Sequence, residues 1–186
     1  LKILKETNAL IEGHFILSSG LHSSKYVQCA QLMSKPYKAS KICISLAEKI
    51  KIEFPNVDLI LSPAMGGIVI GYEIGRILNI ETVFSERVNN QFQLRRGFKI
   101  KKNTNVLIME DVITTGKSSI ECSKLVTASE GTIIGYACII DRSNGKSEIQ
   151  KKIVSQVKLN IPTFTKDNLP KELGAIKPIK PGSRNI

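Results

Sequence analysis

The stretch from Thr104 to Ser119, T-N-V-L-I-M-E-D-V-I-T-T-G-K-S-S, constrains the fold more than any other part of the chain. Its apolar run from Val106 to Met109 is bounded by polar residues, which is typical of a short strand buried on both faces. Helical spacing resumes around Leu125, and Ser118 or Ser119 is expected to cap that helix. The stretch therefore predicts a buried strand, a loop and the start of a helix.

The loop that follows this strand has the chemistry of a phosphate site. The first amides of a helix have no intrahelical partners and the helix dipole favours an anion, while Gly116 allows backbone to approach closely. The hydroxyls of Thr114 and Thr115 add donors. The adjacent carboxylates Glu110 and Asp111 would repel phosphate, so they are expected to bind hydroxyl groups or a divalent cation beside it. A phosphorylated sugar offers both kinds of group.

Two common nucleotide-binding motifs are excluded. The Gly-Lys-Ser triplet at Gly116 is not a Walker A motif, because that motif needs a glycine five positions earlier, where Asp111 stands. No G-x-G-x-x-G occurs in the chain, which removes the strongest argument for a dinucleotide fold.

Strands alternate with helices from residue 40 onward. Helical spacing over Ser40 to Ile52 is followed by an apolar strand at Val57 to Leu61, and further strands are expected at Thr132 to Ile140 and Lys152 to Leu159. This order predicts an α/β fold with a mainly parallel central sheet flanked by helices, whose ligands gather outside the carboxyl ends of the strands. At 186 residues we expect a single domain, 1–186, in which 40–160 form the core.

Two more segments belong to the expected site. Ser62 to Gly67, S-P-A-M-G-G, joins a strand to a predicted helix, and its paired glycines would bring bare amides against a bound group. A tight turn without a ligand is the alternative. Glu86 to Arg96 breaks the pattern with polar residues and three arginines, and its length and polarity predict a mobile excursion.

The net charge of +11 points to an anionic partner. Nucleic acid, a membrane surface and a heavily phosphorylated small substrate all fit, and composition alone does not choose among them. No arm rich in both arginine and aromatic residues is present. The longest uncharged apolar-rich stretch, Leu59 to Tyr72, is interrupted by Pro63 and the adjacent glycines Gly66 and Gly67, and is too short to span a bilayer.

The cysteines favour a reducing cytoplasm. Cys29, Cys43, Cys122 and Cys138 lie far apart without C-x-x-C spacing, and most sit where a reduced thiol packs like a small hydrophobe. The two histidines lack paired ligand spacing, so no metal held by histidine and cysteine is expected.

The sequence E-D-V-I-T-T-G-K-S after an apolar strand resembles the phosphoribosyl diphosphate (PRPP) signature of the type I phosphoribosyltransferases. In that family the acidic pair holds the ribose hydroxyls and the following loop holds the 5-phosphate. The resemblance implies the family fold and assigns PRPP binding to Glu110, Asp111, Val112, Ile113, Thr114, Thr115, Gly116, Lys117 and Ser118. It assigns the diphosphate loop to Ala64, Met65, Gly66 and Gly67.

Three segments are similar to the orotate-specific members of that family. Gly13 to Gln28 resembles their N-terminal hood, here expected within residues 1–35, where a serine-glycine turn and an aromatic strand close over the orotate ring. Ser62 to Gly71 resembles their diphosphate loop. I-I-D-R, which ends at Arg142, resembles the segment whose arginine hydrogen-bonds orotate together with a threonine of the PRPP loop. Orotate binding is thereby implied for Thr114, Arg142 and Tyr26.

The resemblance implies transfer of the 5-phosphoribosyl group from PRPP to N1 of orotate, which yields orotidine 5'-phosphate and diphosphate in pyrimidine biosynthesis. A fixed guanidinium suits orotate because its carboxylate and imide oxygens can pair with it geometrically. Mg2+ is the implied cofactor, held mainly through substrate oxygens. In the family the mobile segment is a lid that reaches the neighbouring subunit's site, which implies a homodimer. The implied catalytic residues are Asp111, Arg87, Arg95 and Arg96.

Some features depart from the family pattern and leave other functions open. Many members have lysine where Ser18 and Gly66 stand, and the segment at Glu86 to Arg96 lacks their lysine-rich, histidine-containing pattern. Which of its arginines meets diphosphate is open. A PRPP-binding nucleic-acid regulator would also account for the high charge, and a purine base is an alternative acceptor.

Overall fold

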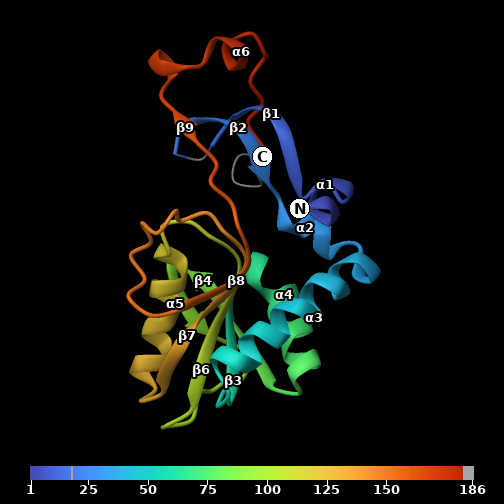
Figure 1. The fold of residues 1–186 in the computed structure, drawn as a ribbon. Helices are drawn as coiled ribbons and strands as arrows, with labels where there is room; N and C mark the ends of the chain where they lie inside the picture. Colours follow the sequence, from blue (N-terminus) through green and yellow to red (C-terminus); the bar gives the residue numbers. More distant parts are fainter. Residues whose placement is uncertain (18, 182–186) are drawn as a thin grey trace. The chain divides into compact units, whose positions relative to one another are not determined.

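The structure is a computed structural model that describes residues 1–17 and 19–181. The chain forms two compact units, drawn in Figure 1. The first contains Leu1–Leu32 and the segment from Asn160 onward, and the second contains Met33–Leu159. Ser18, one of the departures from the family pattern, lies outside the described residues.

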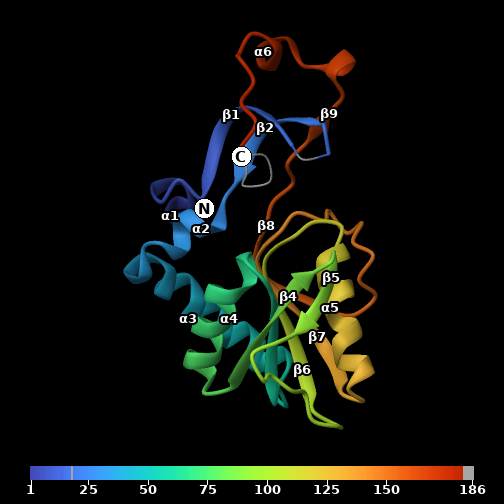
Figure 2. The same ribbon diagram turned by 180° about the vertical axis from the view of Figure 1, so that it is seen from behind.

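The second unit is built on a six-stranded sheet in the order β5-β4-β3-β6-β7-β8. Every neighbouring pair is parallel except β4 and β5, which are antiparallel. Figures 1 and 2 show α3 and α4 on one face and α5 on the other, so the predicted mainly parallel sheet flanked by helices is confirmed. The strands are β3 (Leu59–Pro63), β4 (Glu81–Val88), β5 (Gln91–Leu94), β6 (Asn105–Ile113), β7 (Thr132–Asp141) and β8 (Ile153–Lys158). The helices are α3 (Pro36–Glu53), α4 (Gly66–Leu78) and α5 (Lys117–Ala128).

Strand β6 lies in the interior of this sheet, between β3 and β7. The apolar run from Val106 to Met109 is 0% exposed, because neighbouring strands cover its edges and helices cover both faces. A continuous apolar run rather than an alternating one is what such a doubly covered strand requires. Strand β6 therefore carries the acidic pair, Glu110 and Asp111, toward the carboxyl edge of the sheet.

Glycines let helix α4 lie directly on the sheet. A Cβ on Gly71 would overlap the hydroxyl of Ser62 in β3, and a Cβ on Gly67 would lie only 2.9 Å from the carbonyl oxygen of Met109 in β6. Side chains at these positions would push the helix outward. Their absence brings the first turn of α4, and the loop before it, close to β6.

The segment Glu86 to Arg96, predicted as a mobile excursion, has strand structure that the sequence did not predict, and its mobility stays a prediction. It forms the β4–β5 hairpin, which turns through Asn89 and Asn90, with φ of 49° and 64°. Positive φ at both central residues is typical of two-residue hairpin turns. Phe92 is buried in the core while its neighbours are exposed, so an alternating F-x-L pattern was the overlooked signal of a strand.

The first unit contains a smaller antiparallel sheet in the order β1-β2-β9. Its hairpin agrees with the small N-terminal hood that the sequence predicted. The segment from Asn160 onward returns to this sheet: β9 pairs with β2, and Ile179 forms a bridge with Phe15 in β1. The strands are β1 (Leu10–Ile16), β2 (His22–Val27) and β9 (Thr163–Phe164), and the short helices are α1 (Lys2–Glu6), α2 (Cys29–Met33), η1 (Lys166–Asn168) and α6 (Lys171–Gly174).

None of the helices in the part of the chain that the structure describes has both the length and the apolarity needed to cross a membrane.

Candidate active site

The acidic pair lies near the carboxyl end of β6, on opposite faces of the strand. Asp111 faces α4, since a Cβ on Gly66 would lie 2.8 Å from its Oδ2 atom. Glu110 faces the other side, where its charge helps to raise the pKa of Cys122 in α5. Because consecutive residues of a strand point to opposite faces, one acid borders the predicted diphosphate loop and the other borders α5.

Burial raises the pKa of both acids. It raises the pKa of Glu110 to about 8, and the neighbouring charge of Asp111 adds to this rise. Burial also raises the pKa of Asp111, against the opposing effect of hydrogen bonds from backbone amides, including that of Val112 to Oδ1 at 2.8 Å. Two desolvated carboxylates on consecutive residues favour a cation or hydroxyl donors, which relieve both causes of the shift.

The loop between β6 and α5 presents a group of unused backbone donors. Among the residues that the structure describes, no hydrogen-bond acceptor receives the N–H groups of Thr114, Thr115, Gly116, Ser118 and Ser119. The N–H of Lys117 donates to the Thr115 hydroxyl at 3.4 Å. Unused amides at the start of a twelve-residue helix, with threonine hydroxyls beside them, are the donors that an anion site requires, and their binding of phosphate stays a prediction.

Helix α5 starts two residues earlier than a cap at Ser118 would allow. It begins at Lys117, and Gly116 is its N-cap with φ of 83° and ψ of 1°. Ser118 and Ser119 are inside the first turn, so the predicted serine cap was wrong. The left-handed conformation explains why the loop needs glycine at this position. It also leaves the amides of both serines available to a ligand.

Arg142 follows directly after β7, next to the loop that carries the unused amides. Its backbone N–H donates to the carbonyl of Ile113 at 2.8 Å, and Ile113 pairs with Asp141 in the sheet. Its side chain is half-buried. The structure thus brings Arg142, Thr114 and the acidic pair to the carboxyl ends of two neighbouring strands, where ligands of parallel sheets gather.

The three arginines of the hairpin differ in their partners. Arg87 donates to Glu121 of α5 at 2.5 Å and lies 4.1 Å from the ring centroid of Phe92. Arg96 binds Glu86 through two nitrogens, at 2.9 and 3.1 Å. The guanidinium of Arg95 is exposed and has no hydrogen bond or ion pair within residues 1–17 and 19–181. Their catalytic role stays a prediction.

Comparisons with known proteins agree with this geometry. The family model for the phosphoribosyl transferase domain matches residues 35–168. A protein of Parvibaculum lavamentivorans named orotate phosphoribosyltransferase is 44% identical over 189 residues, which cover 100% of this chain and 97% of that protein. One of the same name from Rhizorhabdus wittichii is 45% identical over 184 residues, covering 97% and 92%. The chain belongs to the orotate phosphoribosyltransferase family.

Solved structures support the fold of this orotate phosphoribosyltransferase family member. The crystal structure of orotate phosphoribosyltransferase from Aeropyrum pernix matches with a TM-score of 0.74 at 22% identity, covering 85% of this chain and 92% of that one. A structure of adenine phosphoribosyltransferase matches with a TM-score of 0.68 at 16% identity, covering 84% and 100%. Because the fold is shared across acceptor bases, it does not by itself select orotate.

Tyr26 belongs to the first unit, and the structure describes it only there. It lies on β2 opposite Ile11, and its ring centroid is 5.7 Å from that of Phe15. The aromatic strand expected from the orotate phosphoribosyltransferases is therefore present. Its contact with a base stays a prediction.

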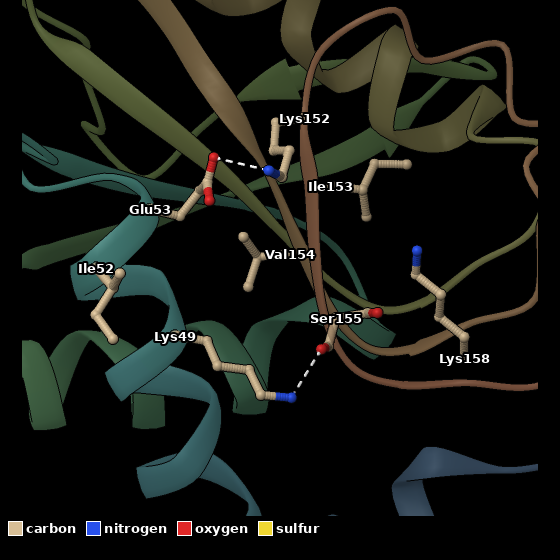
Figure 3. Close-up of a pocket in the computed structure, with 8 residues that line it drawn as sticks. All are labelled: Lys49, Ile52, Glu53, Lys152, Ile153, Val154, Ser155 and Lys158. Carbon is tan, nitrogen blue, oxygen red and sulfur yellow. Dashed lines mark hydrogen bonds and ion pairs between the residues drawn. The ribbon is translucent and has the colours of Figure 1, made fainter.

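The pocket in Figure 3 is separate from the predicted site residues of this family. It lies along the outer edge of the sheet, between α3 and β8. Lys152 pairs with Glu53 at 3.0 Å, and Lys49 donates to the carbonyl of Ser155 at 3.3 Å. Both lysines contact α3 or the edge of β8 and add positive charge to this surface. No ligand is assigned to the pocket.

Sequence reasoning missed the loop between β7 and β8 as part of the site. The N–H of Glu148 donates to the carbonyl of Thr115 at 2.9 Å, and Ile149 packs against Gly116. These contacts join residues more than thirty positions apart in the sequence, so no local sequence pattern predicts them.

Proposed function

We propose that the protein transfers the 5-phosphoribosyl group from PRPP to N1 of orotate, giving orotidine 5'-phosphate and diphosphate. The observation that carries this proposal is the meeting of the acidic pair, the unused amides and Arg142 at the ends of β6 and β7. Near-complete coverage of relatives named orotate phosphoribosyltransferase supports orotate as the acceptor. A phosphorylated sugar beside an anionic pyrimidine needs these three groups together.

Each part of the site has a proposed role. Glu110 and Asp111 accept hydrogen bonds from the ribose hydroxyls, and the loop 112–118 binds the 5-phosphate through its amides and hydroxyls. The loop 64–67 binds diphosphate, and its closeness to Asp111 places it beside the ribose. Arg142 and Thr114 bind orotate. We propose that the whole chain acts as one phosphoribosyltransferase domain, with 1–35 as the hood and 40–160 as the core.

The proposed mechanism needs no protein nucleophile. N1 of orotate displaces diphosphate from the anomeric carbon through an oxocarbenium-like transition state, and catalysis comes from alignment of the two substrates. Arginines of the β4–β5 hairpin stabilise the negative charge that develops on diphosphate. The hairpin acts as a lid that keeps water away from PRPP. Arg95 is the hairpin arginine whose guanidinium can meet diphosphate without first giving up an ion pair.

Mg2+ fits the site as an ion held mainly by the substrate. The described residues contain no group of three or more histidine, cysteine, aspartate or glutamate side chains that could hold a metal. A carboxylate of the acidic pair would offer an oxygen ligand of the kind Mg2+ prefers, and substrate oxygens and water would complete its shell. When bound, the ion would neutralise charge on diphosphate. We propose a reducing cytoplasm as the location, supported by four buried cysteines that form no disulfide within the described residues.

The activity is testable directly. Protein mixed with orotate, PRPP and Mg2+ is expected to consume orotate, which the loss of its ultraviolet absorbance measures. Adenine, guanine or hypoxanthine in place of orotate should give no nucleotide, and in competition should leave orotate consumption unchanged. Absence of orotate consumption, together with salt-sensitive RNA binding, would favour the nucleic-acid regulator instead.

We propose that the protein is a homodimer that buries an apolar stripe on α4. Met65, Val69 and Tyr72 are 82%, 51% and 66% exposed, and their spacing places them on one side of the helix. Exposed apolar residues gathered in this way are typical of an interaction surface. Since Met65 also belongs to the diphosphate loop, a partner packed there would lie beside the active site.

Tyr72→Glu is expected to convert the dimer into a monomer, because it places a charge within the buried stripe. Analytical ultracentrifugation measures the change in mass. Tyr37→Glu is the matched control, since Tyr37 is 70% exposed on α3 and lies outside the stripe. An unchanged mass for both variants would place the dimer contact elsewhere, and a monomeric wild type would contradict the homodimer.

A further inference from the structure

The loop between β7 and β8 holds the phosphate-binding turn from behind. The carbonyl of Thr115 accepts hydrogen bonds from the N–H of Glu148 at 2.9 Å and from the hydroxyl of Ser147 at 3.4 Å. The same hydroxyl accepts a bond from the N–H of Ile149 at 3.1 Å. Ser147 therefore connects its own loop to the turn, with its hydroxyl donating to one partner and accepting from the other.

The contact is close because the turn has a glycine. Gly116 is buried with φ of 83°, and a Cβ there would lie 2.7 Å from both Ser147 Oγ and Ile149 Cγ1. The side chain of Ile149 also packs against the hydrophobic core of the second unit. One side of the turn therefore faces the expected anion. The other side packs against the loop between β7 and β8, which the hydrophobic core anchors through Ile149.

The direction of the Thr115 carbonyl decides whether a phosphate at this turn meets a hydrogen-bond donor or a carbonyl oxygen. In a trans peptide the C=O and N–H groups point in opposite directions, so a carbonyl held toward Ser147 directs the N–H of Gly116 to the other side of the turn. Glycine places little steric barrier in the way of a flip of this peptide. A flipped peptide would present a carbonyl oxygen, rather than a donor, to the anion. The two bonds to Thr115 oppose this flip.

The start of the same loop is also anchored. The N–H of Arg142 donates to Ile113 at 2.8 Å, that of Ser143 donates to Asp141 Oδ1 at 2.8 Å, and that of Lys146 donates to the carbonyl of Ser143 at 2.9 Å. These bonds give the loop a defined path from β7 to the turn. It can therefore act as a fixed support for the turn.

We propose that Ser147 is a positioning residue for PRPP: with the backbone of Glu148, it holds the Thr115–Gly116 peptide in the orientation that offers its N–H to the 5-phosphate. This inference rests on the proposed function, because it assumes that the turn binds the phosphate of the donor sugar. Ser147 acts through the turn and does not itself contact the substrate.

Ser147→Ala is expected to raise the KM for PRPP about fivefold, the effect of one lost hydrogen bond. The value of kcat and the KM for orotate should stay within error, because neither the acceptor site nor the alignment of bound substrates changes. Calorimetric titration with ribose 5-phosphate should show the same loss of affinity. Ser143→Ala is the matched control: its hydroxyl accepts only a local bond from Gly145, at 3.3 Å.

Unchanged affinity for ribose 5-phosphate in Ser147→Ala overturns the inference, and so does equal weakening by Ser143→Ala. A general loss in kcat and in both KM values also overturns it, since that pattern indicates damage to the whole site. Wild-type protein without orotate phosphoribosyltransferase activity overturns the proposed function instead. The ribose 5-phosphate titration still tests the support of the turn in that case.

Discussion

Asp111→Asn is expected to lower kcat/KM for PRPP about a thousandfold, through the loss of charged hydrogen bonds to the ribose hydroxyls. The substitution keeps the size of the side chain, so the close contact with Gly66 and the packing of α4 are preserved. What changes is the charge and the ability to accept two bonds. Since the oxocarbenium-like transition state brings positive charge to the ribose, a carboxylate beside it is worth more there than in the ground state.

Steady-state kinetics with orotate and PRPP measure the effect of Asp111→Asn. Asp58→Asn is the control, because Asp58 accepts a bond from the N–H of Asn105 at 2.8 Å, at the amino end of β6. It makes the same chemical change next to the amino end of β6, away from the site, and should retain activity. A loss of less than tenfold in Asp111→Asn would mean that the ribose hydroxyls are held by other groups.

The core of the fold follows from local patterns. The run from Val106 to Met109 predicts its strand because a continuous apolar segment needs cover on both faces, and β6 has it. The loop after this strand is predictable on a second local ground. A helix that starts at the edge of a sheet leaves its first amides without hydrogen-bond partners. Strand and helix therefore predict the anion site together, before any contact is known.

Other features depend on contacts that no local pattern records. The β4–β5 hairpin was mistaken for an excursion because its polar residues outnumber the single buried Phe92. The return of the chain end to the hood rests on pairs such as Ile16 with Ile179, which are far apart in sequence. The support of Gly116 by Ser147 is similarly non-local. Such features need the tertiary structure, because only the fold brings their partners together.

Arg142→Ala is expected to raise the KM for orotate about a hundredfold, as two charge-assisted hydrogen bonds to the base are lost. The KM for PRPP should change less than about threefold, for a structural reason. Arg142 supports the neighbouring loop through its backbone N–H, which donates to Ile113 at 2.8 Å, and alanine keeps that bond. The substitution therefore removes the base contact and leaves the phosphate loop supported.

Arg142→Lys separates charge from geometry at the same position. Lysine keeps the positive charge but not the planar fork, so we expect the KM for orotate to rise about tenfold, between the wild type and Arg142→Ala. Initial rates at varied orotate and fixed saturating PRPP, then with the roles exchanged, give both constants for each variant. If both KM values rise equally in Arg142→Ala, the arginine acts on the shared structure of the two loops. A selective rise for orotate means instead that its guanidinium binds the base, because only a contact with the acceptor leaves the affinity for the donor unchanged.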